Sequence, residues 1–204
     1  MLRKLYIEPT TKCNLNCRMC FRHTWFDEPI CDLSLEDFRK ALDTMPRTVE
    51  TIFFGGMGEP LFHRDILEMI RIAAETGADV ELLTNGTLLT PEMIRGILDA
   101  DLSRLWISID DLDTEHVQEN AGHNHSRQIL ENIRSFNRLR HTSSNGVSLG
   151  ITFVAMKSNV HQLAKLPFFI AQHLVDEVNV SNISPTDEAS QNELLYTGLV
   201  NMYT

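Results

Sequence analysis

The chain has 204 residues, of which 43% are hydrophobic, and its formal net charge at pH 7 is −10. That length and apolar content allow one sizeable domain with its own core. The acidic balance argues against nucleic acid or a membrane surface as a partner, because both favour a basic face.

The expected compartment is the cytoplasm. No apolar run reaches the roughly 20 residues of a membrane span, and the N-terminal residues lack the apolar core and cleavage site of a signal peptide. Three of the four cysteines lie in one short loop, so a disulfide scaffold is not expected and a reducing compartment fits better.

Strand-like and helix-like segments alternate along the chain. β-Branched, aromatic and other apolar runs predict six strands, at residues 5–7, 49–54, 79–83, 104–110, 147–156 and 175–183. Apolar residues at helical spacing predict helices after the N-cap residue Ser34, at residues 66–74 and, behind Thr90 and Pro91, at residues 93–98.

The second half continues the same alternation. A fourth helix is expected at residues 129–139. Asn159 and Gln162 resemble a capping box for a fifth helix, which should break or kink at Pro167. The polar stretch after residue 183, with a last apolar cluster at residues 194–196, leaves two readings, a sixth helix or an unfinished one.

This alternation indicates an α/β fold with a parallel sheet and right-handed crossovers. Six units in 204 residues fall short of the eight units of a complete barrel, which takes about 250 residues. We therefore expect a partial (β/α)6 barrel. No linker or low-complexity run divides it, so residues 1–204 are expected to form one domain.

The most specific motif is the loop after the first expected strand. Cys13, Cys17 and Cys20 are spaced C-x3-C-x2-C, and clustered thiolates select zinc, copper(I) or an iron–sulfur cluster. A [4Fe–4S] cluster takes four ligands. Three cysteines would leave one iron without a protein ligand, and such an open site can hold a small molecule for chemistry.

A structural zinc site is the alternative for the same loop. Tetrahedral zinc needs a fourth ligand, which His23 or Cys31 could supply, and the chain would then be a non-enzymatic zinc-binding α/β module. For a cluster, Cys31 as a fourth ligand would block the open iron, so that role is not expected. A buried, inert thiol is the other reading of Cys31.

Further unusual residues follow the carboxyl ends of the expected strands, where parallel α/β barrels build their active sites. Glycines let the backbone approach a ligand closely, and a neighbouring carboxylate can accept hydrogen bonds from an ammonium group. The candidates for ligand binding are Gly56, Gly58, Glu59, Asn85, Ser108 and Asp110.

Each candidate also has a plainer interpretation. Glu59 could be a surface carboxylate beside a tight turn, Asn85 part of an Asn-Gly turn, and Asp110 a helix cap. Lys157 is read as a solvated lysine. Three histidines lie in the loop after the fourth strand, where loop solvation is the better reading of His116, His123 and His125.

The chain resembles the radical S-adenosylmethionine enzymes over nearly its whole length. The resemblance is carried by IEPTTKCNLNC, by the cysteine spacing and by FGGMGEP. It implies that Cys13, Cys17 and Cys20 hold a [4Fe–4S] cluster whose open iron is chelated by S-adenosyl-L-methionine. It also implies cofactor-binding roles for the strand-end candidates: Gly56, Gly58 and Glu59 toward the amino group, Ser108 and Asp110 toward the ribose or carboxylate, and Asn85 as a lining residue.

Within that family the chain looks most like maturases with a C-terminal domain for auxiliary clusters, and CRMCFRHTW is similar to maturases associated with tungsten-containing oxidoreductases. The implied activity is reductive cleavage of the cofactor to a 5′-deoxyadenosyl radical that takes hydrogen from a peptide, protein or cofactor undergoing maturation. The implied electron donor is a ferredoxin or flavodoxin. A small-molecule substrate such as a pterin precursor is the alternative.

Three departures from the family pattern stand out. Met19 occupies the place before the third cysteine where relatives usually carry an aromatic ring. The loop after the fourth strand has Gln118 and its neighbours where relatives often place an arginine. No cysteine follows Cys31, so an auxiliary-cluster domain is absent, and we expect a C-terminally truncated core.

Overall fold

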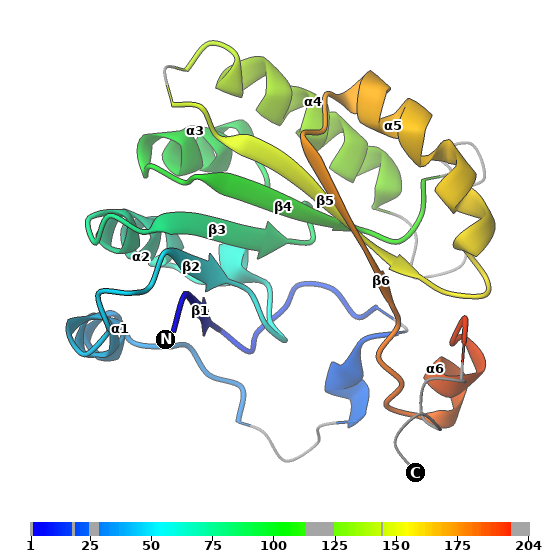
Figure 1. The fold of residues 1–204 in the computed structure, drawn as a ribbon, viewed down its shortest axis with the longest axis horizontal. Helices are drawn as coiled ribbons and strands as arrows, with labels where there is room; N and C mark the ends of the chain where they lie inside the picture. Colours follow the sequence, from blue (N-terminus) through cyan, green and yellow to red (C-terminus); the bar gives the residue numbers. More distant parts are fainter. Residues whose placement is uncertain (1, 18, 25–28, 113–124, 144, 197–204) are drawn as a thin grey trace.

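The computed structural model describes residues 2–17, 19–24, 29–112, 125–143 and 145–196. In these ranges one parallel sheet contains six strands in the order β1-β2-β3-β4-β5-β6 (Figure 1). The strands are β1 (Lys4–Ile7), β2 (Thr51–Phe54), β3 (Asp79–Thr84), β4 (Arg104–Ile109), β5 (Ser148–Ala155) and β6 (Glu177–Asn182). This confirms the predicted α/β half-barrel.

Helices connect successive strands, and α1 to α5 lie along one face of the sheet (Figure 1). The α-helices are α1 (Leu35–Asp43), α2 (Ile66–Ala74), α3 (Pro91–Asp99), α4 (Ser126–Arg140), α5 (Leu166–His173) and α6 (Glu188–Asn192). Short 3-10 helices are η1 (Phe21–Thr24), η2 (Pro60–Phe62) and η3 (Val160–Lys165). The predicted N-caps are confirmed, because Ser34 accepts from the Asp37 N–H and Thr90 from the Met93 N–H.

Two predictions in the last third of the chain need correction. Asn159 makes no side-chain cap, so the predicted capping box with Gln162 is wrong. A 3-10 helix ends at Lys165 and α5 begins at Leu166, so Pro167 lies in the first turn of α5, where its missing N–H costs nothing. Of the two readings for the stretch that follows, the sixth helix is present as α6, which ends before the apolar cluster at residues 194–196.

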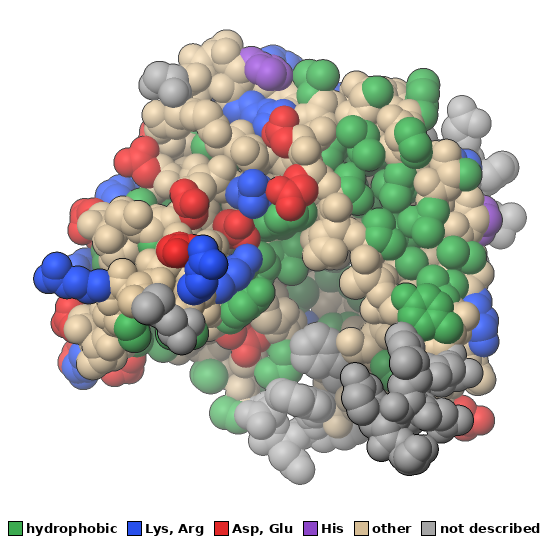
Figure 2. Space-filling model, viewed as in Figure 1, with side chains coloured by type: hydrophobic (Ala, Val, Ile, Leu, Met, Phe, Trp, Pro, Cys, Tyr) green, Lys and Arg blue, Asp and Glu red, His purple; other side chains and the backbone are tan. Residues whose placement is uncertain are grey.

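The core lies between the sheet and the helices. Every second side chain of the central strands points to that side, as the period of a strand requires. The fully buried members from neighbouring strands include Ile52, Phe54, Val80, Leu82, Leu105, Ile107, Ile151 and Phe153. On the face shown in Figure 2, apolar side chains also gather over α5 and β6, where Phe168, Leu174 and Val180 are exposed.

The opposite face of the sheet carries a polar network that joins three strands. Glu81 on β3 is only 8% exposed. Its carboxylate accepts hydrogen bonds from Lys4 Nζ at 2.8 Å, Arg104 at 3.0 Å and Trp106 Nε1 at 3.3 Å. Such a buried carboxylate needs these partners, and the network leaves the carboxyl ends of the strands free for a site.

His173, at the end of α5, links stability to pH. The ring is buried against Phe169, with the centroids 4.5 Å apart, and Nδ1 has no hydrogen-bond partner in the described part of the chain. Burial, together with the positive charge of Arg134, lowers the pKa of His173. Below an unfolded pKa of about 6.5, the unfolded chain therefore takes up a proton that the folded chain resists.

We expect the free energy of unfolding to fall as the pH drops from about 7.5 to about 5.5, because proton uptake favours the unfolded chain in that window. His173→Leu should reduce this fall, measured by urea unfolding at both pH values. His161→Leu, at an exposed position of η3, is the matched control and should keep it. An undiminished fall in His173→Leu would contradict the assignment.

Candidate active site

The cysteine loop follows β1 at the carboxyl edge of the sheet. Cys13, Cys17 and Cys20 are all partly buried. The backbone turns tightly here: the Leu15 N–H donates to Cys13 Sγ at 3.4 Å, and the Cys20 N–H donates to the Cys17 carbonyl at 3.0 Å. Cys17 and Cys20 line a cavity of about 420 Å³. The loop therefore presents thiols to a space that a ligand could fill.

The three thiols affect one another electrostatically. Burial first, and then the charges of Asp110, Cys13 and Cys20, raise the pKa of the Cys17 thiol to about 11. A thiolate is unfavourable in this setting without a nearby cation. Metal binding supplies that positive charge and releases the thiol protons, so the donor set fits a metal centre better than an empty pocket.

A single zinc ion and a [4Fe–4S] cluster require different arrangements of their ligand side chains. A zinc ion binds cysteine sulfurs at about 2.3 Å from one point, and no three or more described His, Cys, Asp or Glu side chains are arranged to hold a single ion in that way. A [4Fe–4S] cluster instead binds its cysteines through separate irons, which lets them lie further apart. The side chain of His23 lies outside the described part of the structure.

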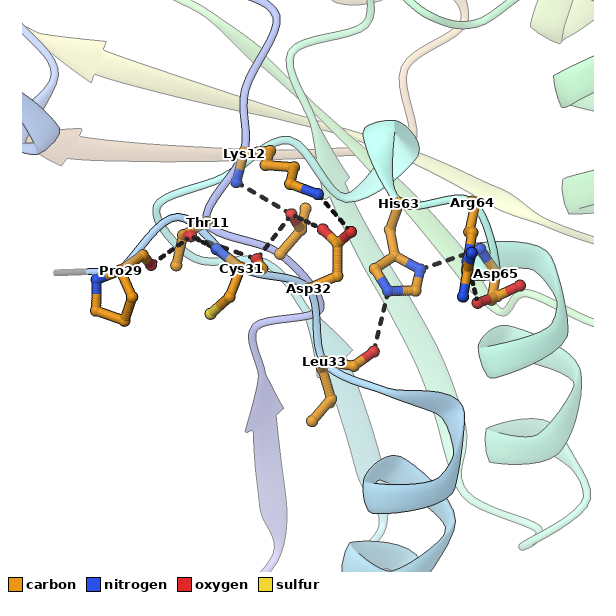
Figure 3. A network of polar contacts seen from close by, with 10 residues as sticks. Thr11, Lys12, Pro29, Cys31, Asp32, Leu33, His63, Arg64 and Asp65 are labelled. Atoms are coloured by element: carbon orange, nitrogen blue, oxygen red, sulfur yellow. Dashed lines mark hydrogen bonds and ion pairs between the residues drawn. The ribbon is translucent and has the colours of Figure 1, made fainter.

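A return segment before α1 braces the cysteine loop (Figure 3). Asp32 accepts from Thr10 Oγ1 at 2.6 Å and from Lys12 Nζ at 2.7 Å. These side-chain hydrogen bonds from Lys12 and Thr10 lower the pKa of Asp32. Thr10 and Asp32 also form a bridge between antiparallel backbones. The loop is thus tied to a second piece of chain through residues that are not part of the cavity lining.

Cys31 belongs to this brace and not to the cavity. Its thiol is exposed, so the expectation of a buried thiol is wrong. The Cys31 N–H donates to Thr11 Oγ1 at 2.9 Å, and its carbonyl accepts from the Thr11 N–H at 3.0 Å. Backbone pairing with Thr11 holds residue 31 at the surface.

His63, directly after η2, bonds to the return segment and so connects it to the chain that follows β2 (Figure 3). Its Nδ1 accepts from the Asp65 N–H at 3.0 Å. The proton of the neutral ring must therefore sit on Nε2, which lies 3.0 Å from the Leu33 carbonyl and donates to it. This fixes the tautomer and connects the return segment to the glycine-rich segment after β2.

The glycine-rich segment lies directly against the cysteine loop. A Cβ at Gly58 would stand 2.0 Å from the Thr10 carbonyl oxygen and 2.6 Å from that of Lys12. The Glu59 N–H donates to the same Lys12 carbonyl at 2.8 Å. Gly56 has a φ of +139°, which side chains rarely adopt. Gly58 is needed because one backbone packs on another, whereas Gly56 is needed for its positive φ.

Glu8, just after β1, holds the other side of this segment. Its Oε1 accepts from the Met57 N–H and from the Gly58 N–H, the latter at 3.3 Å. Successive N–H groups that point at one carboxylate oxygen form a small anion-binding turn. The cysteine loop and the glycine-rich segment therefore contact each other through backbone atoms and are locked from both ends.

We predict that Gly58→Ala weakens this contact. The added methyl group meets backbone and not a flexible side chain, so relief should cost about 1–3 kcal/mol of unfolding free energy and move the cysteine loop. Iron content after anaerobic reconstitution should fall with it. Gly146→Ala, where a Cβ would meet nothing within 4 Å, is the control. Full iron content and unchanged stability in Gly58→Ala would contradict the packing argument.

Glu59 is buried behind the glycine-rich segment, so its interpretation as a surface carboxylate is wrong. The residue is 2% exposed and is not part of the cavity lining. Its oxygens accept from Thr84 Oγ1 at 2.6 Å, the Asn85 N–H at 2.7 Å and the Leu61 N–H at 3.0 Å. Burial raises its pKa, against the lowering effect of these donors. It ties β2 to β3 and is no surface carboxylate.

Glu59→Gln should destabilise the fold. The amide group has one oxygen for three donors, so its NH2 would face an N–H or O–H group that donates. Leaving a buried donor unsatisfied costs about 1–3 kcal/mol, which denaturant unfolding can measure. Glu75→Gln, at an exposed position after α2, should change little. Equal stability of the two variants would argue against the hydrogen bonds around Glu59.

The cavity lies where the carboxyl ends of several strands meet. Asn85, Ser108 and Asp110, all predicted from the sequence, line it together with Cys17 and Cys20. Met19, noted above as a departure from the family pattern, also lines it. The loop region around Gln118 lies outside the described residues. The structure thus brings three of the six non-cysteine candidates to the cavity and places Gly56, Gly58 and Glu59 outside its lining.

One wall of the cavity contains two residues that were not among the binding candidates, Asn159 and Gln162. Asn159 donates to the carbonyls of Asp110 and Val154, both at 2.9 Å, and Gln162 accepts from the Leu112 N–H at 2.6 Å. Both residues line the cavity. They connect the ends of β4 and β5, and their position after a strand was the available signal, which the capping-box reading obscured.

The segment around α6 completes that wall. Its contribution consists of Thr186, Asp187, Ala189, Ser190 and Glu193. The Lys157 N–H donates to the Glu193 carbonyl at 3.0 Å and the Ser158 N–H to its carboxylate at 2.9 Å. Lys157 itself is exposed, as predicted. Of the three loop histidines, His125 lines the cavity, while His116 and His123 lie outside the described residues.

A half-barrel with a three-cysteine loop over a cavity at its carboxyl edge defines a class of metal-cluster enzymes. The chain belongs to the radical SAM superfamily, whose family model matches residues 7–156. The cofactors of that family are a [4Fe–4S] cluster and S-adenosyl-L-methionine.

No described helix is long and apolar enough to cross a membrane.

Among its relatives is the tungsten-containing aldehyde ferredoxin oxidoreductase cofactor-modifying protein of Pyrococcus furiosus. The two are 33% identical over 98% of this chain and 57% of the relative. The PqqA peptide cyclase of Bradyrhizobium diazoefficiens is 26% identical over 87% of this chain and 45% of the relative. The chain therefore spans about half the length of these curated relatives.

Solved structures show the same fold. Streptococcus suis SuiB bound to its precursor peptide SuiA superimposes with a TM-score of 0.74 at 22% sequence identity, over 96% of this chain and 42% of SuiB. SuiB bound to S-adenosylmethionine also gives a TM-score of 0.74, at 18% identity, over 96% of this chain and 44% of SuiB.

Proposed function

We propose that residues 1–204 form the core domain of a radical S-adenosylmethionine maturase. The observation that carries the proposal is a cavity of about 420 Å³, lined by Cys17 and Cys20 of the three-cysteine loop, at the carboxyl edge of a parallel half-barrel. Bound there, the reduced cluster would supply the one electron that cleaves S-adenosyl-L-methionine to methionine and a 5′-deoxyadenosyl radical, which would then abstract hydrogen from the substrate.

The residues of this chain then have separate tasks. Cys13, Cys17 and Cys20 would hold three irons and leave the fourth facing the cavity. Ser108 and Asp110 line the same cavity as Cys17 and Cys20 and are proposed to contact the cofactor. The backbone around the cofactor site would be held in position by three residues that do not line the cavity, Gly56, Gly58 and Glu59. A direct contact between Glu59 and the cofactor stays a prediction.

The charge of the cavity supports this cofactor. Four carboxylates belong to its lining, those of Asp110, Asp111, Asp187 and Glu193. An acidic lining favours a ligand that carries positive charge. The sulfonium and ammonium groups of S-adenosyl-L-methionine are cations, and they suit the field that these residues create.

The proposed substrate is a peptide, a protein or a cofactor undergoing maturation. One relative is named as cofactor-modifying and another as a peptide cyclase, and SuiB was solved with a precursor peptide. A small molecule such as a pterin precursor is the competing substrate class. The proposal also includes a cytoplasmic location, where thiols stay reduced, and a ferredoxin or flavodoxin as electron donor.

We expect anaerobic reconstitution to give about four irons and four sulfides per chain and a brown protein. With dithionite, this protein should cleave S-adenosyl-L-methionine to 5′-deoxyadenosine and methionine, detected by chromatography. Alanine at Cys13, Cys17 or Cys20 should abolish both the cluster and the product.

Cys31→Ala is the matched control and should keep cluster and cleavage, because the exposed thiol of Cys31 lies in the brace behind the loop. Loss of the cluster in Cys31→Ala would refute the three-ligand assignment. A colourless protein with one tightly bound zinc would favour the zinc-binding module. An intact cluster that gives no 5′-deoxyadenosine would count against the enzymatic proposal.

A further inference from the structure

The side chain of Asn85 reaches the sulfur of Cys13. Asn85 follows β3, and its Nδ2 lies 3.9 Å from Cys13 Sγ, within the longer range that bonds to sulfur take. The same nitrogen donates to Asn14 Oδ1 at 3.0 Å. The two hydrogens of the amide therefore have one acceptor each, and one of them is a cysteine of the three-cysteine loop.

The orientation of this amide is fixed by its other end. Asn85 Oδ1 accepts from the Thr87 N–H at 3.0 Å and from Thr87 Oγ1 at 2.6 Å. A flipped amide would turn its NH2 toward a backbone N–H, which can only donate. Thr87 Oγ1 in turn accepts from Asn14 Nδ2 at 2.8 Å. The ring of Asn14, Asn85 and Thr87 thus permits one arrangement of donors and acceptors.

The backbone that carries Asn85 is also held in place. Glu59 accepts from the Asn85 N–H at 2.7 Å. From α4, Gln128 donates to the Thr87 carbonyl at 2.9 Å and Asn132 to the Gly86 carbonyl at 2.8 Å. Gly86 has a φ of +77°, which allows the chain to turn at this point. Asn85 is therefore oriented toward Cys13 by contacts from the cysteine loop, from the segment after β2 and from α4.

We propose that Asn85 is a positioning residue that donates a hydrogen bond to the cluster ligand Cys13 and so raises the reduction potential of the cluster. The inference rests on the proposed function, because it takes Cys13 as a cluster ligand. Reduction adds negative charge that the cysteine sulfurs share, and a hydrogen bond to such a sulfur stabilises the reduced state. The Leu15 N–H also donates to Cys13 Sγ, and this backbone donor remains in every variant below.

The test is a redox titration of the reconstituted protein with dithionite, followed by the electron paramagnetic resonance signal of the reduced cluster. Asn85→Leu removes the donor, and the potential should shift to a more negative value. Asn85→Asp replaces the donor by a charge and should shift it further in the same direction. Iron and sulfide analysis on the same samples confirms that the cluster is intact.

Thr87 provides variants that leave Asn85 in place. Thr87→Val removes the hydroxyl that holds the amide, so the potential should shift in the same direction by less, whereas Thr87→Ser keeps the hydroxyl and should restore the wild-type value. If Asn85→Leu fails to retain a cluster, the Thr87 pair still decides. An unchanged potential in Asn85→Leu, or in Thr87→Val when Asn85→Leu cannot be loaded, would overturn the inference.

The role of Asn85 and the proposed enzymatic activity can fail independently of each other. A wild-type protein that cleaves S-adenosyl-L-methionine while Asn85→Leu keeps the wild-type potential would refute only the role of Asn85. A wild-type protein with a cluster but without cleavage would refute the proposed activity, and the potentials of the variants would still report on the hydrogen bond to Cys13.

Discussion

The contact on which the rest of the site depends is made between two backbones. The glycine-rich segment after β2 lies against the loop after β1, with Gly58 beside the Thr10 carbonyl and the Glu59 N–H donating to Lys12. No side chain fits between them. A loop with little secondary structure of its own thereby acquires a fixed shape from a rigid neighbour, which is what a cluster with one open iron requires of its ligands.

Glu59 extends that contact into the sheet. Its buried carboxylate bonds to the end of β3 through Thr84 and the Asn85 N–H. The end of β3 in turn meets the cysteine loop through Asn85 and Asn14. Three strand ends are therefore joined by polar contacts between loops. The strands themselves are held by the apolar core between the sheet and the helices. Core packing sets the architecture, and these hydrogen bonds set the position of the thiols.

Local patterns were sufficient to predict the fold. Apolar runs marked all six strands, and Ser34 and Thr90 marked helix starts, because each signal depends on neighbours within a few residues. The site needed contacts that no local pattern contains. Glu59 bonds to a residue 26 positions further along, and Asn159 to one 49 positions back. The predicted roles of both residues rested on their immediate neighbours, and the structure shows that distant partners determine where they lie.

The residues that hold the cysteine loop and most of those that line the cavity come from different parts of the chain. The residues that brace the cysteine loop include Glu8, Asp32, Gly58, His63, Asn85 and Thr87, which all belong to the first half of the chain. Apart from the cysteine loop itself and Asn85, the cavity lining comes from β4 onward. Substitutions in the lining beyond β5 can therefore alter which molecule the cavity accepts, while the described contacts that hold the three thiols stay unchanged.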